Sequence, residues 1–346
     1  MFNFNVRNAS VFLATAVLAA SATAQPLVAT FDSPTLDRWM YPFNSTPGSE
    51  ASAPSFGAIQ IAGFDDRDGQ FLLGWNTAAV IPQGKPLENY RLSAARLRLT
   101  VNVDMQFRYD PTPDSFVTLL DKADAAYVAD SDLGKPVELF GAGYRNGWTS
   151  STFNENSLFG GAPIVPPAEG ARNVFPAMFS PAGVATDISR QIRQRFDASS
   201  MAIGLTNAVT PGQLVPAGTV LTFDVDLCAP ETRAYFQRAL ASGRLMLVVS
   251  SLQPAQGGPD GGTGTPTYPA FYTKENLIGL AFAPKLELDL TVAKPADYNG
   301  DEFINGDDFD AYVQAFVDGT ASADFNGDCF VNGDDFDAFV IAFEIG

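Results

Sequence analysis

The C-terminal fifty residues contain one pattern twice, and this repeat most constrains what the chain can fold into. The first copy reads D-x-N-x-D from Asp297 and continues through Asn305 to Asp308. The second copy begins 27 residues later, at Asp324, with the same spacing. Apolar residues follow each loop at i, i+3, i+4 and i+7, which predicts two short amphipathic helices packed on each other. These apolar positions are Phe309, Tyr312, Val313 and Phe316, then Phe336, Phe339, Val340 and Phe343.

The residues of each loop offer the ligands that calcium prefers, which are six to eight oxygens from carboxylates, amides and backbone carbonyls. Loop positions one, three, five, nine and twelve would supply side-chain oxygens, and position seven a backbone carbonyl. We therefore predict two calcium ions. The predicted ligands are Asp297, Asn299, Asp301, Phe303, Asn305 and Asp308 in the first loop, and Asp324, Asn326, Asp328, Phe330, Asn332 and Asp335 in the second.

The charge of this segment supports the prediction. Residues 297–346 hold 13 of the 39 acidic residues of the chain and no Lys or Arg. Without a cation these charges would repel one another, so we expect the segment to fold together with calcium binding. The alternative is an acidic disordered tail, but such a tail would not repeat its Asn and aromatic positions in register.

The repeated segment resembles a type I dockerin, the module that docks into cohesin domains of polysaccharide-degrading assemblies, as in bacterial dockerin-anchored surface proteins. The resemblance implies a small all-α module and a cohesin-like partner. It also implies that loop positions ten and eleven contact that partner. These are Gly306 and Asp307 in one copy and Gly333 and Asp334 in the other. Since the two copies are identical there, the module would be able to dock in two orientations related by a half-turn.

Position six of each loop departs from the usual Gly, which serves a turn that needs a positive φ. Glu302 and Cys329 stand there, and each should cost about 1 kcal/mol. The only other cysteine is Cys228. A disulfide between them would suit a secreted protein, but the two lie in different predicted modules, so we expect two free thiols.

The N-terminal residues are organised like a secretory signal peptide. Arg7 precedes the apolar core Ala9–Ala20, and Ala22-Thr-Ala24 offers small residues for cleavage. No later run of apolar residues is long enough to span a bilayer, so we expect a secreted, extracellular or cell-surface protein that is not membrane-spanning. The predicted divisions are a signal peptide at 1–24, a β domain at 25–292, a linker at 293–296 and the dockerin-like module at 297–346.

The body shows the patterns of a mostly β protein. Apolar residues occupy alternate positions in 97–107 and 285–292, whereas Leu245–Ser251 is continuously apolar, as in a strand buried on both faces. Two short helices are predicted, one capped by Asp187 and one that begins at Pro230 and ends at Gly243. Because a strand follows each helix, the body is predicted to be a two-sheet sandwich with short crossover helices.

In the order of its segments the body is similar to DNRLRE-type, disaggregatase-related domains of secreted proteins. The similarity implies a jelly-roll-like sandwich, and some domains of that kind bind polysaccharide. The Pro- and Gly-rich stretches 160–183 and 253–269 are predicted as surface loops. The similar segments are Gly69–Asn76, Ile81–Gly84, Leu92–Leu99, Phe223–Leu227, Gly243–Val249 and Ala283–Leu288.

Composition excludes several functions. The chain has no histidine, which removes Ser-His-Asp and Cys-His catalysis and imidazole-ligated metal sites. Nothing resembles a basic stripe, so a nucleic acid is not an expected partner. Scattered arginines leave an anionic polysaccharide open as a ligand: Arg91, Arg96, Arg98, Arg172, Arg190, Arg193 and Arg195.

Three groups in the body are candidates for chemistry. A charged run at 65–68 reads most simply as a polar hairpin turn, and otherwise as a second metal site or an acid pair. Asp224 and Asp226 share a strand face at roughly 6.5–7 Å, within the spacing of glycosidase carboxylates, although they read most simply as solvent-facing strand positions. Exposed aromatics stack on sugar rings, but they also fill cores; the candidate sugar platform is Tyr144, Trp148 and Phe153.

The pattern as a whole favours a secreted, dockerin-bearing protein with a non-catalytic polysaccharide-binding or structural body. One alternative is a polysaccharide-degrading enzyme of the glycoside hydrolase type that carries a dockerin. Another is a purely structural cell-surface protein whose calcium module only stabilises the end of the chain.

Overall fold

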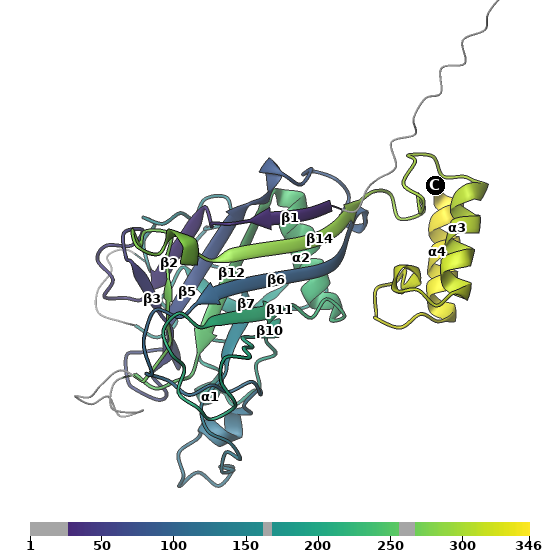
Figure 1. Ribbon diagram of the computed structural model, residues 1–346. Helices are drawn as coiled ribbons and strands as arrows, with labels where there is room; N and C mark the ends of the chain where they lie inside the picture. Colours follow the sequence, from purple (N-terminus) through teal and green to yellow (C-terminus); the bar gives the residue numbers. More distant parts are fainter. Residues whose placement is uncertain (1–26, 162–167, 256–266) are drawn as a thin grey trace, which may run out of the picture.

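The computed structural model describes residues 27–161, 168–255 and 267–346 (Figure 1). The predicted signal peptide lies outside these residues. The described chain is mostly β, as predicted, and every pair of named strands is antiparallel. No helix in the described ranges has the length and apolar character that crossing a membrane requires.

Two large sheets form the body. The smaller has the order β1 (Leu27–Phe31), β14 (Lys285–Val292), β6 (Tyr90–Thr100) and β11 (Val220–Asp224). The larger has the order β2 (Leu36–Met40), β5 (Arg67–Asn76), β12 (Arg244–Ser251), β7 (Val137–Tyr144), β8 (Val174–Phe179) and β9 (Ala185–Asp187). Two short strands extend the larger sheet, β4 (Phe56–Gly57) on β5 and β10 (Ala202–Ile203) on β7, while β13 (Ala270–Tyr272) and β3 (Ser52–Pro54) form a separate two-stranded sheet.

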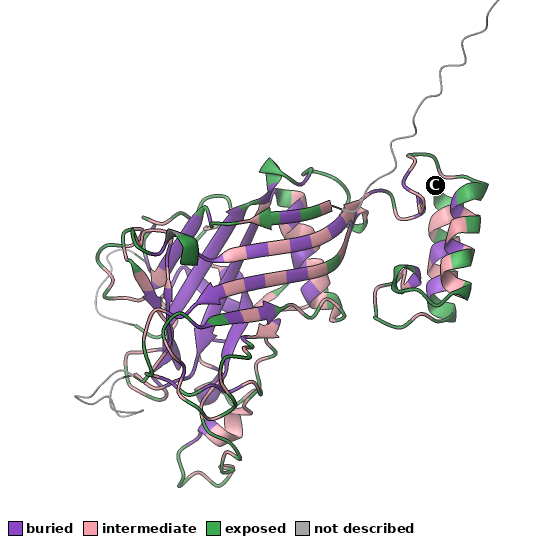
Figure 2. Ribbon diagram, viewed as in Figure 1, coloured by how far each residue is buried: buried purple, intermediate pink, exposed green. Residues whose placement is uncertain are grey.

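The two sheets differ in how they are buried (Figure 2). In β14 buried and half-buried residues alternate, so one face of the smaller sheet meets the core. In β5, β7 and β12 nearly every residue is buried. These patterns confirm the alternating reading of 285–292 and the two-sided burial predicted for Leu245–Ser251.

A different apolar cluster lies on each face of the larger sheet. The main core joins side chains from both sheets, with Phe71 and Val249 of the larger sheet meeting Leu97 and Leu288 of the smaller. A second cluster takes the alternate residues of β5 and β12, such as Leu72 and Val248, and packs them against aromatic residues of the loop after β7. That loop therefore acts as a cover for the larger sheet.

The two predicted body helices have different outcomes. α2 (Pro230–Ser242) is confirmed, with Pro at its first position and Gly243 ending it at φ 76°. It packs against β6 and β12 and buries Phe236 and Leu240 in the main core. The helix expected after Asp187 is only one turn, α1 (Gln191–Gln194), because Arg195 adopts a left-handed conformation and ends it.

The prediction of a surface loop at 160–183 is wrong for part of that stretch. β8 occupies Val174–Phe179, and its first four residues are buried. Proline usually avoids such strands because it cannot donate to the ladder. Pro176 lies within this strand, and its carbonyl accepts from the Ile188 backbone N–H at 3.1 Å, just beyond the neighbouring strand β9.

The C-terminal segment contains the helices α3 (Gly306–Val317) and α4 (Gly333–Ile345). They lie side by side beyond the end of β14 (Figure 1). The connection is packed rather than free, since Ala293 and Ala296 are buried and the Ala293 N–H donates to the Asn89 carbonyl at 3.1 Å.

Candidate metal centre

The helices α3 and α4 each begin with a reciprocal cap that shapes the loop before the helix. The Asn305 side chain accepts from the Asp307 N–H at 2.7 Å, and the Asp308 carboxylate accepts from the Asn305 N–H at 2.9 Å. The second copy repeats both contacts with Asn332, Asp334 and Asp335. Such a capping box stabilises the first turn of a helix, so the position-twelve carboxylate is fixed where a helix begins.

Aromatic packing holds the two copies together. The rings of Tyr312 and Phe339 are stacked, with centroids 3.9 Å apart, and both side chains are fully buried. Around this pair lie the other aromatic residues of the two repeats: Tyr298, Phe309, Phe316, Phe325, Phe336 and Phe343. The apolar spacing predicted from the sequence thus forms one small core, and each loop projects from it.

Within each loop, backbone N–H groups bind the acidic side chains. In the first loop the Asp308 carboxylate also accepts from the Asn299 N–H at 3.0 Å, and Asn299 Oδ1 accepts from the Asp301 N–H at 2.9 Å. The second loop has the same bonds. There, Asp324, Asp328 and Asp335 each bring an oxygen to within 4.8 Å of the others.

One buried carboxylate oxygen in each loop receives no hydrogen bond from the described residues. Oδ2 of Asp297 accepts from the Glu302 N–H at 3.0 Å, and Oδ2 of Asp324 accepts from the Cys329 N–H at 2.8 Å. Oδ1 of each carboxylate is buried and receives no hydrogen bond from any described residue. Burial raises the pKa of both carboxyl groups. A buried carboxylate oxygen without a partner is costly, and the cost falls on the same position in both copies.

The donor set fits calcium. Every candidate side-chain ligand is a carboxylate or an amide oxygen, the ligand type that calcium takes, whereas zinc prefers nitrogen and sulfur. The one sulfur in the loops, that of Cys329, is bonded in a disulfide. Glu302 and Cys329 have φ values of 72° and 69°, the positive φ expected at position six.

The expectation of two free thiols is wrong. Cys228 and Cys329 form a disulfide, with Cα atoms 5.5 Å apart. The two cysteines are 101 residues apart in the sequence. The bond joins the segment after β11, where Cys228 lies, to the second calcium-type loop. A division of the chain into a separate body and C-terminal segment does not predict this pairing, because the second loop lies against the start of α2.

A second contact supports this attachment. Arg233 of α2 donates from Nη1 to the Asn326 carbonyl at 2.7 Å and from Nε to the Leu227 carbonyl at 3.1 Å. One guanidinium thus bridges the body and the second loop, beside the disulfide. The linker before the first loop has a different neighbour, since Arg91 Nη1 donates to the Pro295 carbonyl at 3.5 Å.

The positions assigned to a partner by the resemblance are open to solvent. Gly306, Asp307, Gly333 and Asp334 are all exposed. Phe303 and Phe330 also expose about seven-tenths of their side chains, 69% and 71%. Since only their backbone carbonyls were predicted as ligands, the rings are left as a matched pair of surface aromatics.

The candidate sugar platform is corrected by the structure. Tyr144, Trp148 and Phe153 do belong to one cluster, but Phe153 is fully buried and the other two are packed partly against it. Trp148 meets Phe153 edge-on, with centroids 5.5 Å apart. These aromatics cover the larger sheet, so Phe153 has no free face for a sugar ring.

The charged run at 65–68 is not an exposed turn. All four side chains are buried, and each charge faces a partner far away in sequence. Arg172 Nε donates to Asp65 at 3.0 Å, Arg67 Nη2 to Glu138 at 2.5 Å, and Arg193 Nε to Asp66 at 3.0 Å. Residues 65–68 thus belong to a buried ion-pair network at the start of β5, rather than to an acid pair in a cleft.

Asp68 makes the stability of this network depend on pH. Burial raises the pKa of Asp68 from 3.8 to about 6, against the attraction of Arg172. A carboxyl group whose pKa is raised by folding stabilises the fold when protonated; this contribution is full below pH 3.8 and is lost as the pH rises through about 6. As the pH rises from 3.8 to about 6, we expect the free energy of unfolding of the wild type to fall relative to that of D68N. Urea unfolding at several pH values measures this difference. A constant difference would contradict this assignment.

The candidate catalytic pair lies at the surface. Asp224 ends β11 and receives the Arg96 guanidinium at 2.5 Å, while Asp226 accepts from the Cys228 N–H at 3.0 Å. Both residues are exposed. Their partners are structural, which favours the solvent-facing reading over an active site.

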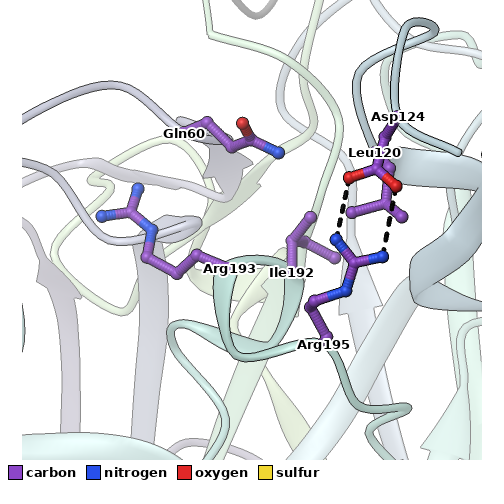
Figure 3. A pocket seen from close by; sticks show the side chains of 6 residues that line it. All are labelled: Gln60, Leu120, Asp124, Ile192, Arg193 and Arg195. Carbon is purple, nitrogen blue, oxygen red and sulfur yellow. Dashed lines mark hydrogen bonds and ion pairs between the residues drawn. The ribbon is translucent and has the colours of Figure 1, made fainter. Parts of the chain in front are cut away.

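A small open pocket of about 320 Å³ lies beside α1. Figure 3 shows Arg193 and Arg195 at its rim, with Arg195 making two hydrogen bonds to the Asp124 carboxylate. Arg193 is paired with Asp66 and Glu169. Both guanidinium groups are therefore neutralised by the protein itself, which leaves little positive charge for an anionic polysaccharide.

The sequence matches no protein-family model, and no curated protein shows significant similarity to it.

Proposed function

We propose that residues 297–346 form a dockerin-like, all-α module that binds two calcium ions, one in each loop. The observation that carries this proposal is that the buried Oδ1 atoms of Asp297 and Asp324 receive no hydrogen bond from the part of the chain that the structure describes. Calcium would supply the positive charge that these oxygens lack and would link the oxygens of one loop to each other. The twelve predicted ligands named above would hold the two ions.

Calcium titration of the full chain tests the proposal loop by loop. D297N and D324N each remove one negative charge at position one, so each variant is expected to lose one of the tail ions by isothermal titration calorimetry. D310N, an exposed carboxylate on α3, serves as the control and should leave the number unchanged. Equal stoichiometry in wild type, D297N and D324N would refute the two-site assignment.

We propose further that the module docks to a cohesin-like domain. Gly306 and Asp307 occupy the same exposed place in the first copy as Gly333 and Asp334 in the second, which supports docking in two orientations. On an immobilised type I cohesin domain with calcium present, D307A and D334A are each expected to retain binding, and the double variant to lose it. Full binding by the double variant would exclude these positions as contacts.

For the body we propose a jelly-roll-like sandwich of the DNRLRE-related type that is non-catalytic and either binds polysaccharide or is structural. A secreted, extracellular or cell-surface location is proposed with it, since disulfides persist in oxidising compartments. The surface placement of Asp224 and Asp226 supports a body without catalysis. Pull-down on insoluble polysaccharides, with reducing-sugar release assayed in the same tubes, tests this: sugar release would instead establish a glycoside hydrolase.

A further inference from the structure

The segment that links β6 to β7 contains a second kind of acidic site, inside the body. Between Thr100 and Val137 it has no strand and only one short 3-10 turn, Phe116–Leu119. Stretches of this length without regular structure are uncommon in compact domains unless something holds them. Three aspartates that are distant in the segment meet here, Asp110, Asp114 and Asp132, and each brings an oxygen to within 4.8 Å of the others.

Asp110 is the buried member of this group. It is 3% exposed. Its Oδ1 accepts from the Thr112 N–H at 2.9 Å and from the Thr112 hydroxyl at 2.7 Å. Its Oδ2 is buried and finds no donor among residues 27–161, 168–255 and 267–346. The carboxylate therefore presents an unused acceptor in a place where water does not reach it.

The protein supplies too little positive charge for this group. Lys135 Nζ lies 3.1 Å from Asp114 and also pairs with Asp130. Among the described residues, the Lys135 ammonium is thus the one cation paired within this group of four carboxylates, Asp110, Asp114, Asp130 and Asp132. Burial also raises the pKa of Asp110 and of Asp114, the latter to about 6.

A comparable acidic group elsewhere differs in the place of its lysine. Asp37, Glu155 and Glu275 surround Lys274, whose Nζ contacts all three. The buried Asp37 uses both oxygens, since Oδ1 receives Lys274 Nζ at 2.7 Å and Oδ2 the Lys274 N–H at 2.6 Å. Both oxygens of the buried Asp37 are thus partnered, unlike those of Asp110, although Oε2 of Glu275 receives no hydrogen bond from the described residues.

We propose that Asp110, Asp114 and Asp132 bind a divalent cation, calcium by the chemistry of the donors, which fastens the 101–136 segment to the body. The ligands on offer are carboxylate oxygens, with the Thr112 hydroxyl 2.9 Å from Asp132 Oδ2. A hard cation takes such an all-oxygen set. This site is separate from the two proposed in the C-terminal segment.

The ion count by native mass spectrometry in calcium tests the proposal. The parent is the full chain carrying D297N and D324N, so that the tail sites do not contribute. Adding D132A, whose side chain is exposed, should remove one further ion without disturbing the core, and adding D110N should do the same. D121A, an exposed carboxylate in the same segment, should leave the count unchanged.

Limited trypsin cleavage gives a second readout. Lys122 is exposed within the segment, and calcium is expected to slow cleavage after it by about tenfold in the parent, in line with a site that orders a loop. D132A should abolish this protection, whereas D121A should keep it. An ion count that D132A and D110N leave unchanged, or cleavage insensitive to calcium in the parent, would overturn the proposal. If the tail sites themselves fail, wild type and parent will have equal counts, while the D132A difference will persist.

Discussion

Removing the disulfide by the double substitution C228S/C329S is expected to lower the free energy of unfolding by about 4–5 kcal/mol, the loop-entropy value for a crosslink that closes about 100 residues. The bond joins positions 101 residues apart, so it restricts a large part of the unfolded chain. In the folded state it also keeps the second loop against α2. Urea unfolding in calcium, with and without a reductant, measures the effect.

Two comparisons isolate the cause of this loss. Reductant should destabilise the wild type to the level of C228S/C329S and leave the variant unchanged. C228S/C329G should recover about 1 kcal/mol relative to C228S/C329S, because glycine adopts the φ of 69° at position 329 without strain. A wild-type midpoint that does not respond to reductant would show that the crosslink does not contribute to stability.

The substitution R172M is expected to cost about 3–5 kcal/mol, the usual loss when one partner of a buried ion pair is removed. Arg172 is 1% exposed and binds Asp65 Oδ2 at 3.0 Å and the Asp68 carbonyl at 3.1 Å. Its loss would leave two buried carboxylates without a counter-charge. Chemical denaturation at neutral pH measures the change, and D65N/D68N/R172M should recover most of it.

The exposed pair of Arg96 with Asp224 provides a matched control. Its N···O distance is 2.5 Å, yet the Arg96 side chain is 40% exposed. Solvent screening limits such a pair to about 0–1 kcal/mol, so R96M should change stability far less than R172M. If R172M costs no more than R96M, the buried network does not stabilise the fold.

The parts of this fold that could be predicted from sequence are those governed by local periodicity. Alternation predicted β14, a continuous apolar run predicted the two-sided burial of β12, and Pro230 with Gly243 marked the ends of α2. The i, i+3, i+4, i+7 spacing after each calcium-type loop likewise placed α3 and α4, because a helix brings those positions onto one face.

The parts that could not be predicted depend on partners distant in the chain. A run of charges at 65–68 reads as exposed because its counter-ions are Arg172, Glu138 and Arg193, more than 70 residues away. Cys228 and Cys329 gave no local sign of pairing. Only the folded arrangement shows that Asp110 is buried while Asp132 is exposed, although both belong to one irregular segment.

Hydrogen–deuterium exchange of the intact protein, in calcium and after chelation by EGTA, shows whether residues 297–346 fold around calcium. The amides of α3 and α4 are expected to be protected in calcium and to exchange rapidly in EGTA, since the acidic loops would lose the charge that holds them. Protection in the sheet strands β5 and β12 should remain. Equal protection of α3 and α4 in calcium and in EGTA would contradict the claim that this segment folds around calcium.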